Sequence, residues 1–85
     1  MHISLSPQFR RQFRKLEQPL QEEVLEKIEL FKDRKNRKQL KAHPLHGRLK
    51  DRYSFSVNYK FRIVFIYLSK NEVVLLAIGD HDVYK

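Results

Sequence analysis

The side chains best suited to proton transfer in this chain are histidines, because a neutral imidazole can take or give a proton near neutral pH. Three of the four, His43, His46 and His81, lie in segments that flank expected strands. Loops at strand ends are common positions for catalytic side chains. These histidines are therefore candidate acid–base residues, and the competing interpretation is an ordinary hydrogen-bonding role at the surface.

A metal site is not expected from these histidines. His43 and His46 lie close together in a loop that contains Pro44, and the chain has no cysteine. They also lack the helical His-x-x-x-His spacing that binds zinc in metalloproteases. We expect neither a metal nor another cofactor.

Arg62 interrupts the apolar segment 61–68, so its guanidinium must reach solvent, pair with a carboxylate or face a ligand. Asp80 and Asp82 are the candidate ion-pair partners. A phosphate is the candidate ligand, because the guanidinium is a planar fork of donors that suits phosphate. Tyr84 has two similar interpretations, since it could close the core or offer a ring on which a nucleobase stacks.

The distribution of charge indicates a polyanionic partner. The 85 residues include 18 Lys and Arg against 10 Asp and Glu, a net charge of +8. Residues 32–62 alone hold eleven basic and two acidic residues, a net charge of +9, while the rest of the chain is almost neutral. A soluble surface usually intersperses the two signs. The basic segment is therefore typical of a nucleic-acid contact, with a solvated surface as the alternative.

Composition excludes several other classes of protein. The absence of cysteine excludes a disulfide framework and a zinc finger, and it fits a cytoplasmic protein. Charged residues interrupt every apolar run too early for a membrane span. A chain of 85 residues is too short for two cores, so we expect a single domain over residues 1–85.

Two helices are expected after a short strand over residues 2–5. Ser6 and Pro7 form a typical helix start, and Pro19 is placed to end this helix and to begin another. Apolar residues at helical spacing continue to Phe31. The charged residues 33–38 that follow could extend the second helix or form a loop.

Three strands are expected in the second half of the chain. Residues 53–57 alternate between apolar and polar, which predicts a strand near a sheet edge with Ser54 and Ser56 exposed to solvent. Residues 61–68 and 72–78 are apolar on both faces, which predicts two central strands joined by a hairpin. The fold class is α+β: an N-terminal strand and an antiparallel two-helix hairpin packed on a small antiparallel sheet. Two helices cover one face of this sheet, so the other face needs the chain itself or a partner.

The order of elements and several short motifs resemble the RelE/ParE superfamily of bacterial type II toxin–antitoxin toxins. The resemblance covers nearly the whole chain in the order β-α-α-β-β-β, and it is nearest to the RelE-like and YafQ-like messenger-RNA endonucleases. The motifs that carry it are His43-Pro44-Leu45-His46-Gly47, Tyr53-Ser54-Phe55-Ser56-Val57, Phe61-Arg62-Ile63-Val64-Phe65 and Ile78-Gly79-Asp80-His81-Asp82-Val83-Tyr84.

The resemblance implies cleavage of mRNA on the ribosome and neutralisation by a cognate antitoxin in a heteromeric complex. In this chemistry the 2′-hydroxyl attacks the adjacent phosphate, which requires a base, an acid and cations that stabilise the charged intermediate. The resemblance implies that His43 and His81 are the base and the acid in either order, that Arg62 holds the phosphate, and that Tyr84 orients the 2′-hydroxyl or stacks on a base. The side chains expected to bind RNA are His46, Arg48, Lys50, Arg52 and Lys60.

Two other functions remain open at this stage. A ParE-like toxin would bind and inhibit DNA gyrase without catalysis, and it would not need the four catalytic candidates to converge. A plain nucleic-acid-binding module would depend on the basic segment alone, although the chain has no recognised helix-turn-helix or RNA-binding aromatic motif.

Overall fold

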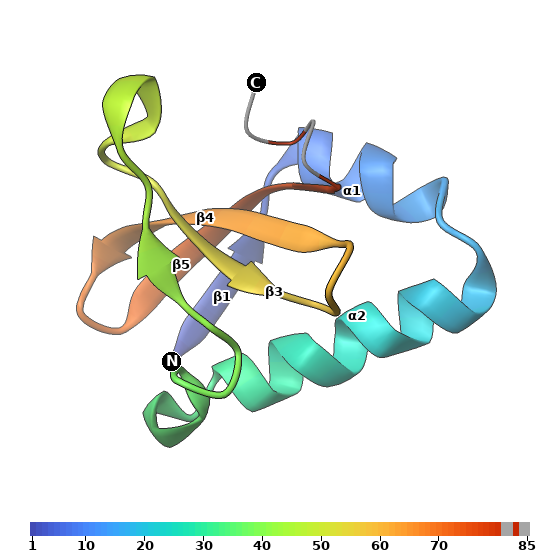
Figure 1. Ribbon diagram of the computed structural model, residues 1–85, viewed down its shortest axis with the longest axis horizontal. Coiled ribbons are helices and arrows are strands. Elements are labelled where there is room, and N and C mark those ends of the chain that lie inside the picture. Colours follow the sequence, from blue (N-terminus) through green and yellow to red (C-terminus); the bar gives the residue numbers. More distant parts are fainter. Residues whose placement is uncertain (81–82, 84–85) are drawn as a thin grey trace.

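The computed structural model describes residues 1–80 and 83. In this part of the chain a short strand is followed by two helices and then by four strands, one of which has only two residues (Figure 1). The elements are β1 (His2–Leu5), α1 (Pro7–Arg14), α2 (Gln18–Phe31), the 3-10 turn η1 (Arg34–Asn36), β2 (His43–Pro44), the 3-10 turn η2 (Gly47–Leu49), β3 (Tyr53–Ser56), β4 (Arg62–Ser69) and β5 (Glu72–Gly79). The expected α+β fold is confirmed.

The strands form one mixed sheet in the order β1-β5-β4-β3-β2. The pairs β2–β3, β3–β4 and β4–β5 are antiparallel, but β1 runs parallel to β5, with Ile3 opposite Val73. The expectation of an antiparallel sheet is therefore wrong at this edge. Parallel neighbours need a long connection, and here most of the chain separates the two strands, so no turn motif in the sequence sets their direction.

Helix α1 begins where the sequence predicts and is tied to β5. The hydroxyl of Ser6 accepts a hydrogen bond from the Phe9 amide at 3.0 Å and donates one to the Leu76 carbonyl at 2.9 Å. Further along, Gln12 Oε1 accepts a hydrogen bond from the Ile78 amide at 2.8 Å. These side chains satisfy backbone groups of β5 beyond the end of β1, so α1 covers a sheet edge that would otherwise be open.

Helix α2 contains Pro19 in its first turn and ends at Phe31, as expected. The charged segment after it was expected to extend the helix or to form a loop. It does neither throughout, because Arg34–Asn36 fold into the short 3-10 turn η1. Asp33 caps this turn by accepting a hydrogen bond from the Lys35 amide at 3.1 Å.

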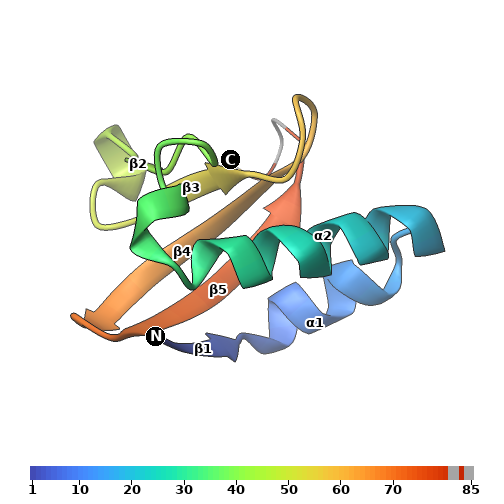
Figure 2. The ribbon, with the colours of Figure 1, turned by 90° about the horizontal axis from the view of Figure 1, so that it is seen from below.

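The core lies between α2 and one face of the sheet, while α1 runs along the β5 edge (Figure 2). The ring of Phe31 stacks on Phe55 at a centroid distance of 4.3 Å and meets Phe65 edge-on at 4.8 Å. Other side chains buried in this core are Phe9, Val24, Leu40, Val57, Ile63, Val73, Leu75 and Ile78. As expected, β4 and β5 are central strands.

The sheet face opposite α2, called the outer face below, is more covered than the sequence predicts. The expectation that Ser54 faces solvent is wrong, because Ser54 is fully buried. Val64 and Ala77, its neighbours across the sheet, are also buried. The unforeseen strand β2 pairs along β3, which places Ser54 inside the sheet. The chain itself therefore supplies part of the second cover that the strands require.

We predict that Ser6→Ala lowers the free energy of unfolding by about 1–2 kcal/mol, because it removes both the helix cap and the hydrogen bond to β5. Urea unfolding followed by circular dichroism measures the change. Gln8→Ala is the control, since Gln8 is exposed in the same helix. Equal stability of the two variants would show that the Ser6 contacts contribute nothing.

Candidate functional site

Two adjacent rows of paired residues on the outer face carry two of the catalytic candidates. Residues paired across antiparallel strands project to the same side of a sheet. One row contains His43, Ser54, Val64 and Ala77, and the next contains Ser56, Arg62 and Gly79. His43 and Arg62 are thus separated by two strand spacings across the sheet and by two residues along the strands. At the usual spacings their Cα atoms are roughly 12 Å apart. Two long side chains at this separation can reach one small anionic group bound between them.

Arg62 is partly buried at the start of β4, and neutral acceptors hold its guanidinium. Nη1 donates to Ser56 Oγ at 3.1 Å and to the Asn58 carbonyl at 2.9 Å. Ion pairs between described residues join only close neighbours in sequence, and Arg62 forms none with Asp80. The other expected partner, Asp82, lies outside the described residues. Within residues 1–80 and 83, Arg62 is therefore oriented by neutral groups, which do not neutralise its positive charge.

His43 is exposed on β2, and a backbone contact sets its tautomer. Its Nδ1 lies 2.8 Å from the carbonyl oxygen of Lys41. A carbonyl oxygen only accepts, so Nδ1 carries the proton in this contact and the neutral ring presents Nε2 as an acceptor. In this state His43 is arranged to take up a proton.

The backbone that holds His43 is strained at Lys41. This residue has a φ of 57°, in the left-handed region, which costs a residue with a Cβ roughly 1–2 kcal/mol. The Lys41 amide donates to the Lys38 carbonyl at 3.1 Å, and the Ala42 amide donates to the Arg37 carbonyl at 3.0 Å. These bonds maintain the tight turn that directs the Lys41 carbonyl toward His43.

A polar cleft of about 480 Å³ lies on the outer face between α1 and the central strands, and we call it the outer cleft. Val64 and Ala77 form part of its lining, Arg11 enters from α1, and Arg52 enters from the segment before β3. None of the described lining residues is acidic. The cleft therefore attracts anions, and Val64 is only two residues, about 7 Å, from Arg62 along β4.

The residues expected to bind RNA fall into two groups. His46, Arg48, Lys50 and Arg52 are exposed in and around η2, which lies on the side of the sheet away from α2 (Figure 1). Lys60 is exposed on the turn between β3 and β4, with Nζ 5.6 Å from the centre of the Phe61 ring. The catalytic candidates His81 and Tyr84 lie outside the described residues.

Arg11 was not among the site residues expected from the sequence. The Arg11 side chain is exposed on α1. Arg11 reaches the outer cleft because α1 docks on β5, so that this side of the helix borders the cleft. The sequence does not contain this docked position in any short motif. A basic residue on the helix side opposite Phe9 and Phe13 was the available signal.

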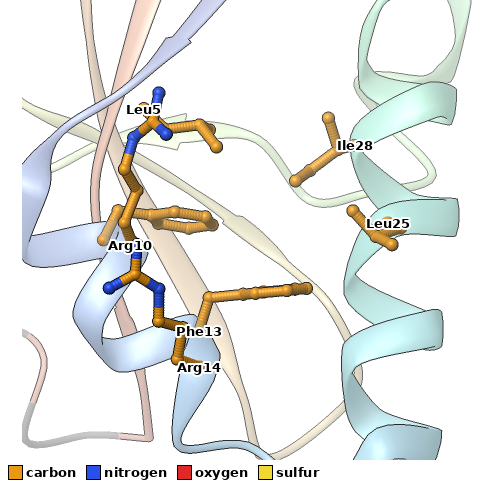
Figure 3. A pocket seen from close by; sticks show the side chains of 7 residues that line it. Leu5, Arg10, Phe13, Arg14, Leu25 and Ile28 are labelled. Atoms are coloured by element: carbon orange, nitrogen blue, oxygen red, sulfur yellow. The ribbon is translucent and has the colours of Figure 1, made fainter.

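A second, apolar depression separates the two helices, and we call it the interhelix groove. Leu5, Phe13, Leu25 and Ile28 line this pocket of about 290 Å³, with Arg10 and Arg14 at its α1 side (Figure 3). Leu25 is 53% exposed. The groove therefore offers a small apolar surface that another molecule could contact.

Among the described residues, no group of three or more histidine or acidic side chains is placed to hold a metal ion. Within the same residues, no helix is both long enough and apolar enough to cross a membrane.

The fold is similar to that of several solved toxin structures. A chain of the YoeB–YefM complex from Staphylococcus aureus matches with a TM-score of 0.74 and 18% identity over 95% of this chain and 97% of that one. A chain of the RelBE2 toxin–antitoxin complex from Mycobacterium tuberculosis matches with 0.71 and 20%, over 94% and 96%. YafQ from E. coli matches with 0.70 and 16%, over 96% and 94%.

Comparison of the sequence with protein-family models finds no match, and comparison with curated proteins finds none either. The structural likenesses establish the fold at low sequence identity. This chain has the α+β fold of the RelE/ParE toxins, as the resemblance of its motifs predicts.

We predict that Lys41→Gly raises the free energy of unfolding by up to about 1 kcal/mol, because glycine adopts the left-handed conformation without a Cβ clash. The gain is partly offset by the greater flexibility of glycine in the unfolded chain. Urea unfolding measures the difference, and Lys38→Gly is the control in the same turn. A loss of stability in Lys41→Gly as large as that in Lys38→Gly would contradict the strain at this position.

Proposed function

We propose that this chain is the toxin of a type II toxin–antitoxin pair and that it cleaves mRNA on the ribosome by attack of a 2′-hydroxyl on the adjacent phosphate. The observation that carries this proposal is the common position of Arg62 and His43 on the outer face, beside a cleft lined by Arg11 and Arg52. The toxin fold supports it, since structures with this fold include RelBE2 and YoeB–YefM complexes.

In the proposed mechanism Arg62 stabilises the charge that develops on the phosphate. Its bonds to Ser56 and Asn58 use Nη1, so the guanidinium is positioned before the RNA binds. Nη2 and Nε carry three further N–H donors that can face the phosphate oxygens. A charge that is oriented in advance stabilises the transition state without reorganisation during the reaction.

His43 is assigned the role of general base in this proposal. Its Nδ1 contact with Lys41 leaves Nε2 as the acceptor that can remove the proton from the 2′-hydroxyl. His81 then protonates the leaving 5′-oxygen, and Tyr84 orients the 2′-hydroxyl or stacks on a base. The last two roles follow from the resemblance of motifs alone.

The same proposal includes a cognate antitoxin that occupies the interhelix groove. Apolar side chains of the antitoxin would cover Phe13, Leu25 and Ile28, and its acidic residues would pair with Arg10 and Arg14. From the sequence, the chain itself or a partner was expected to cover the second face of the sheet. The groove is a better candidate, because the chain itself buries Val64 and Ala77 on the outer face.

We predict that expression without an antitoxin stops growth by stopping translation, with mRNA cut inside reading frames. Mapping of transcript 5′ ends together with pulse labelling of protein synthesis tests this outcome. Intact transcripts in cells whose DNA gyrase is inhibited would contradict the proposal and would indicate the ParE-like alternative.

A second prediction concerns catalysis at the outer face. Arg62→Ala and His43→Ala should each lower the cleavage rate by about 10²–10³-fold, the usual cost of losing a transition-state charge or an acid–base group. Arg62→Ala also loses two hydrogen bonds, about 1–2 kcal/mol of stability, so rates are compared at equal amounts of folded protein. Lys70→Ala removes an exposed cation elsewhere and is the control. Full activity in both site variants would exclude this site.

A third prediction concerns the antitoxin. Leu25→Asp should weaken binding of the antitoxin at least about tenfold, because it places a charge in an apolar contact. Leu68→Asp is a matched control, since Leu68 is 60% exposed but lies outside the groove. Isothermal titration with the purified cognate antitoxin measures both affinities. Equal losses in the two variants would place the antitoxin elsewhere.

A further inference from the structure

Tyr59 is the most exposed large hydrophobic side chain in the described part of the chain, at 91% exposure. It lies on the turn between β3 and β4, which runs beside α2 (Figure 1). The other exposed large apolar residues are Leu25 and Leu68, which lie on α2 and at the far end of β4. Tyr59 is therefore an isolated aromatic ring and not part of an apolar patch.

Hydrogen bonds of Asn58 join the turn that carries Tyr59 to its own backbone, to α2 and to β4. Asn58 Oδ1 accepts hydrogen bonds from the amides of Lys60 and Phe61, at 2.9 and 2.8 Å. Asn58 Nδ2 donates to Glu23 Oε1 on α2 at 2.7 Å, and the Asn58 carbonyl accepts from Arg62. A flexible turn would explain an exposed ring by itself, but this turn presents Tyr59 from a fixed backbone.

Three lysines lie near the ring. Lys27 and Lys41 line a pocket of about 230 Å³ together with Tyr59, and Lys60 follows in the sequence. Two carboxylates also lie near these residues: Glu23 is bound to Asn58, and Glu26 is 3.9 Å from Lys27 Nζ. Lys41 and Lys60 are exposed, and neither is in an ion pair between described residues.

We propose that Tyr59 is a stacking platform for one unpaired base of single-stranded RNA, with Lys41 and Lys60 as contacts for the adjoining phosphates. An isolated ring among cations matches a strand that alternates bases and phosphates. A protein partner would instead require apolar neighbours around the ring. The inference rests on the proposed function, and it extends the substrate contact from Arg62 along the turn that Arg62 itself holds.

The direct test uses Tyr59→Trp, because the chain has no tryptophan and the new indole reports on this position alone. The probe is a single-stranded oligoribonucleotide with 2′-O-methyl riboses, which cannot be cleaved, so binding is measured independently of catalysis. The indole fluorescence should be quenched to saturation as this RNA is added. An abasic oligomer with the same number of phosphates should leave the fluorescence unchanged. Quenching by both oligomers, or by neither, would overturn the proposal.

Matched variants test the contribution of the ring to affinity for the same RNA, measured by fluorescence anisotropy of labelled oligomer. Tyr59→Ala should weaken binding about 5- to 150-fold, the usual cost of losing one stacked base, and Tyr59→Phe should bind as the native chain does. Leu68→Ala is the control for an exposed apolar side chain. If Tyr59→Ala bound the RNA with native affinity, the proposal would be overturned. This holds even if that variant bound the antitoxin more weakly, because Tyr59 would then contact the protein partner and not RNA.

Lys41→Gly removes a cation while its backbone conformation stays favourable. It should lower the slope of log affinity against log salt concentration by about 0.7, the value for one contact with a single-stranded phosphate. An unchanged slope would overturn the role of Lys41. These binding results are separate from the proposed function, because uncut transcripts in cells would refute cleavage whether or not Tyr59 stacks on RNA.

Discussion

The packing of Phe31 against Phe55 and Phe65 is the interaction on which the arrangement of the sheet depends. Successive side chains in a strand point to opposite faces. Because Phe55 faces α2, its neighbours Ser54 and Ser56 on β3 point to the outer face. Because Phe65 also faces α2, Arg62, three residues earlier on β4, points to the outer face as well. The same aromatic contact that stabilises the core therefore determines which polar residues gather on the other side. A shift of one residue in the pairing of either strand would turn its aromatic side chains to the outer face and its polar side chains to the core.

The outer face combines fixed and exposed charges. Arg62 is partly buried and oriented by Ser56 and Asn58, whereas Arg11 and Arg52 line the neighbouring cleft. Oriented charge suits the stabilisation of a transition state, and exposed charge suits the attraction of a polyanion over a distance. The apolar interhelix groove lies apart from both, so the surface proposed for the antitoxin differs in chemistry from the surface proposed for RNA.

Local signals predicted the helices and central strands well, because Ser6, Pro7 and Pro19 act within a few residues of themselves. The parallel pairing of β1 and the burial of Ser54 depend on contacts between distant segments, and no short motif encodes them. Arg62 was recognisable as a candidate site residue, since a guanidinium in an apolar strand must reach solvent, an acidic partner or a ligand. The contribution of Arg11 to the cleft was not, because it requires the docked position of α1.

In the proposed function, RNA binds across the outer face between His43 and Arg62. Nuclear magnetic resonance of the isotope-labelled chain tests it most directly, with an RNA dinucleotide whose attacking 2′-hydroxyl is replaced by hydrogen. We expect the largest amide shift changes at Ser54, Ser56 and Arg62. Changes confined to the interhelix groove, around Phe13 and Leu25, would contradict it.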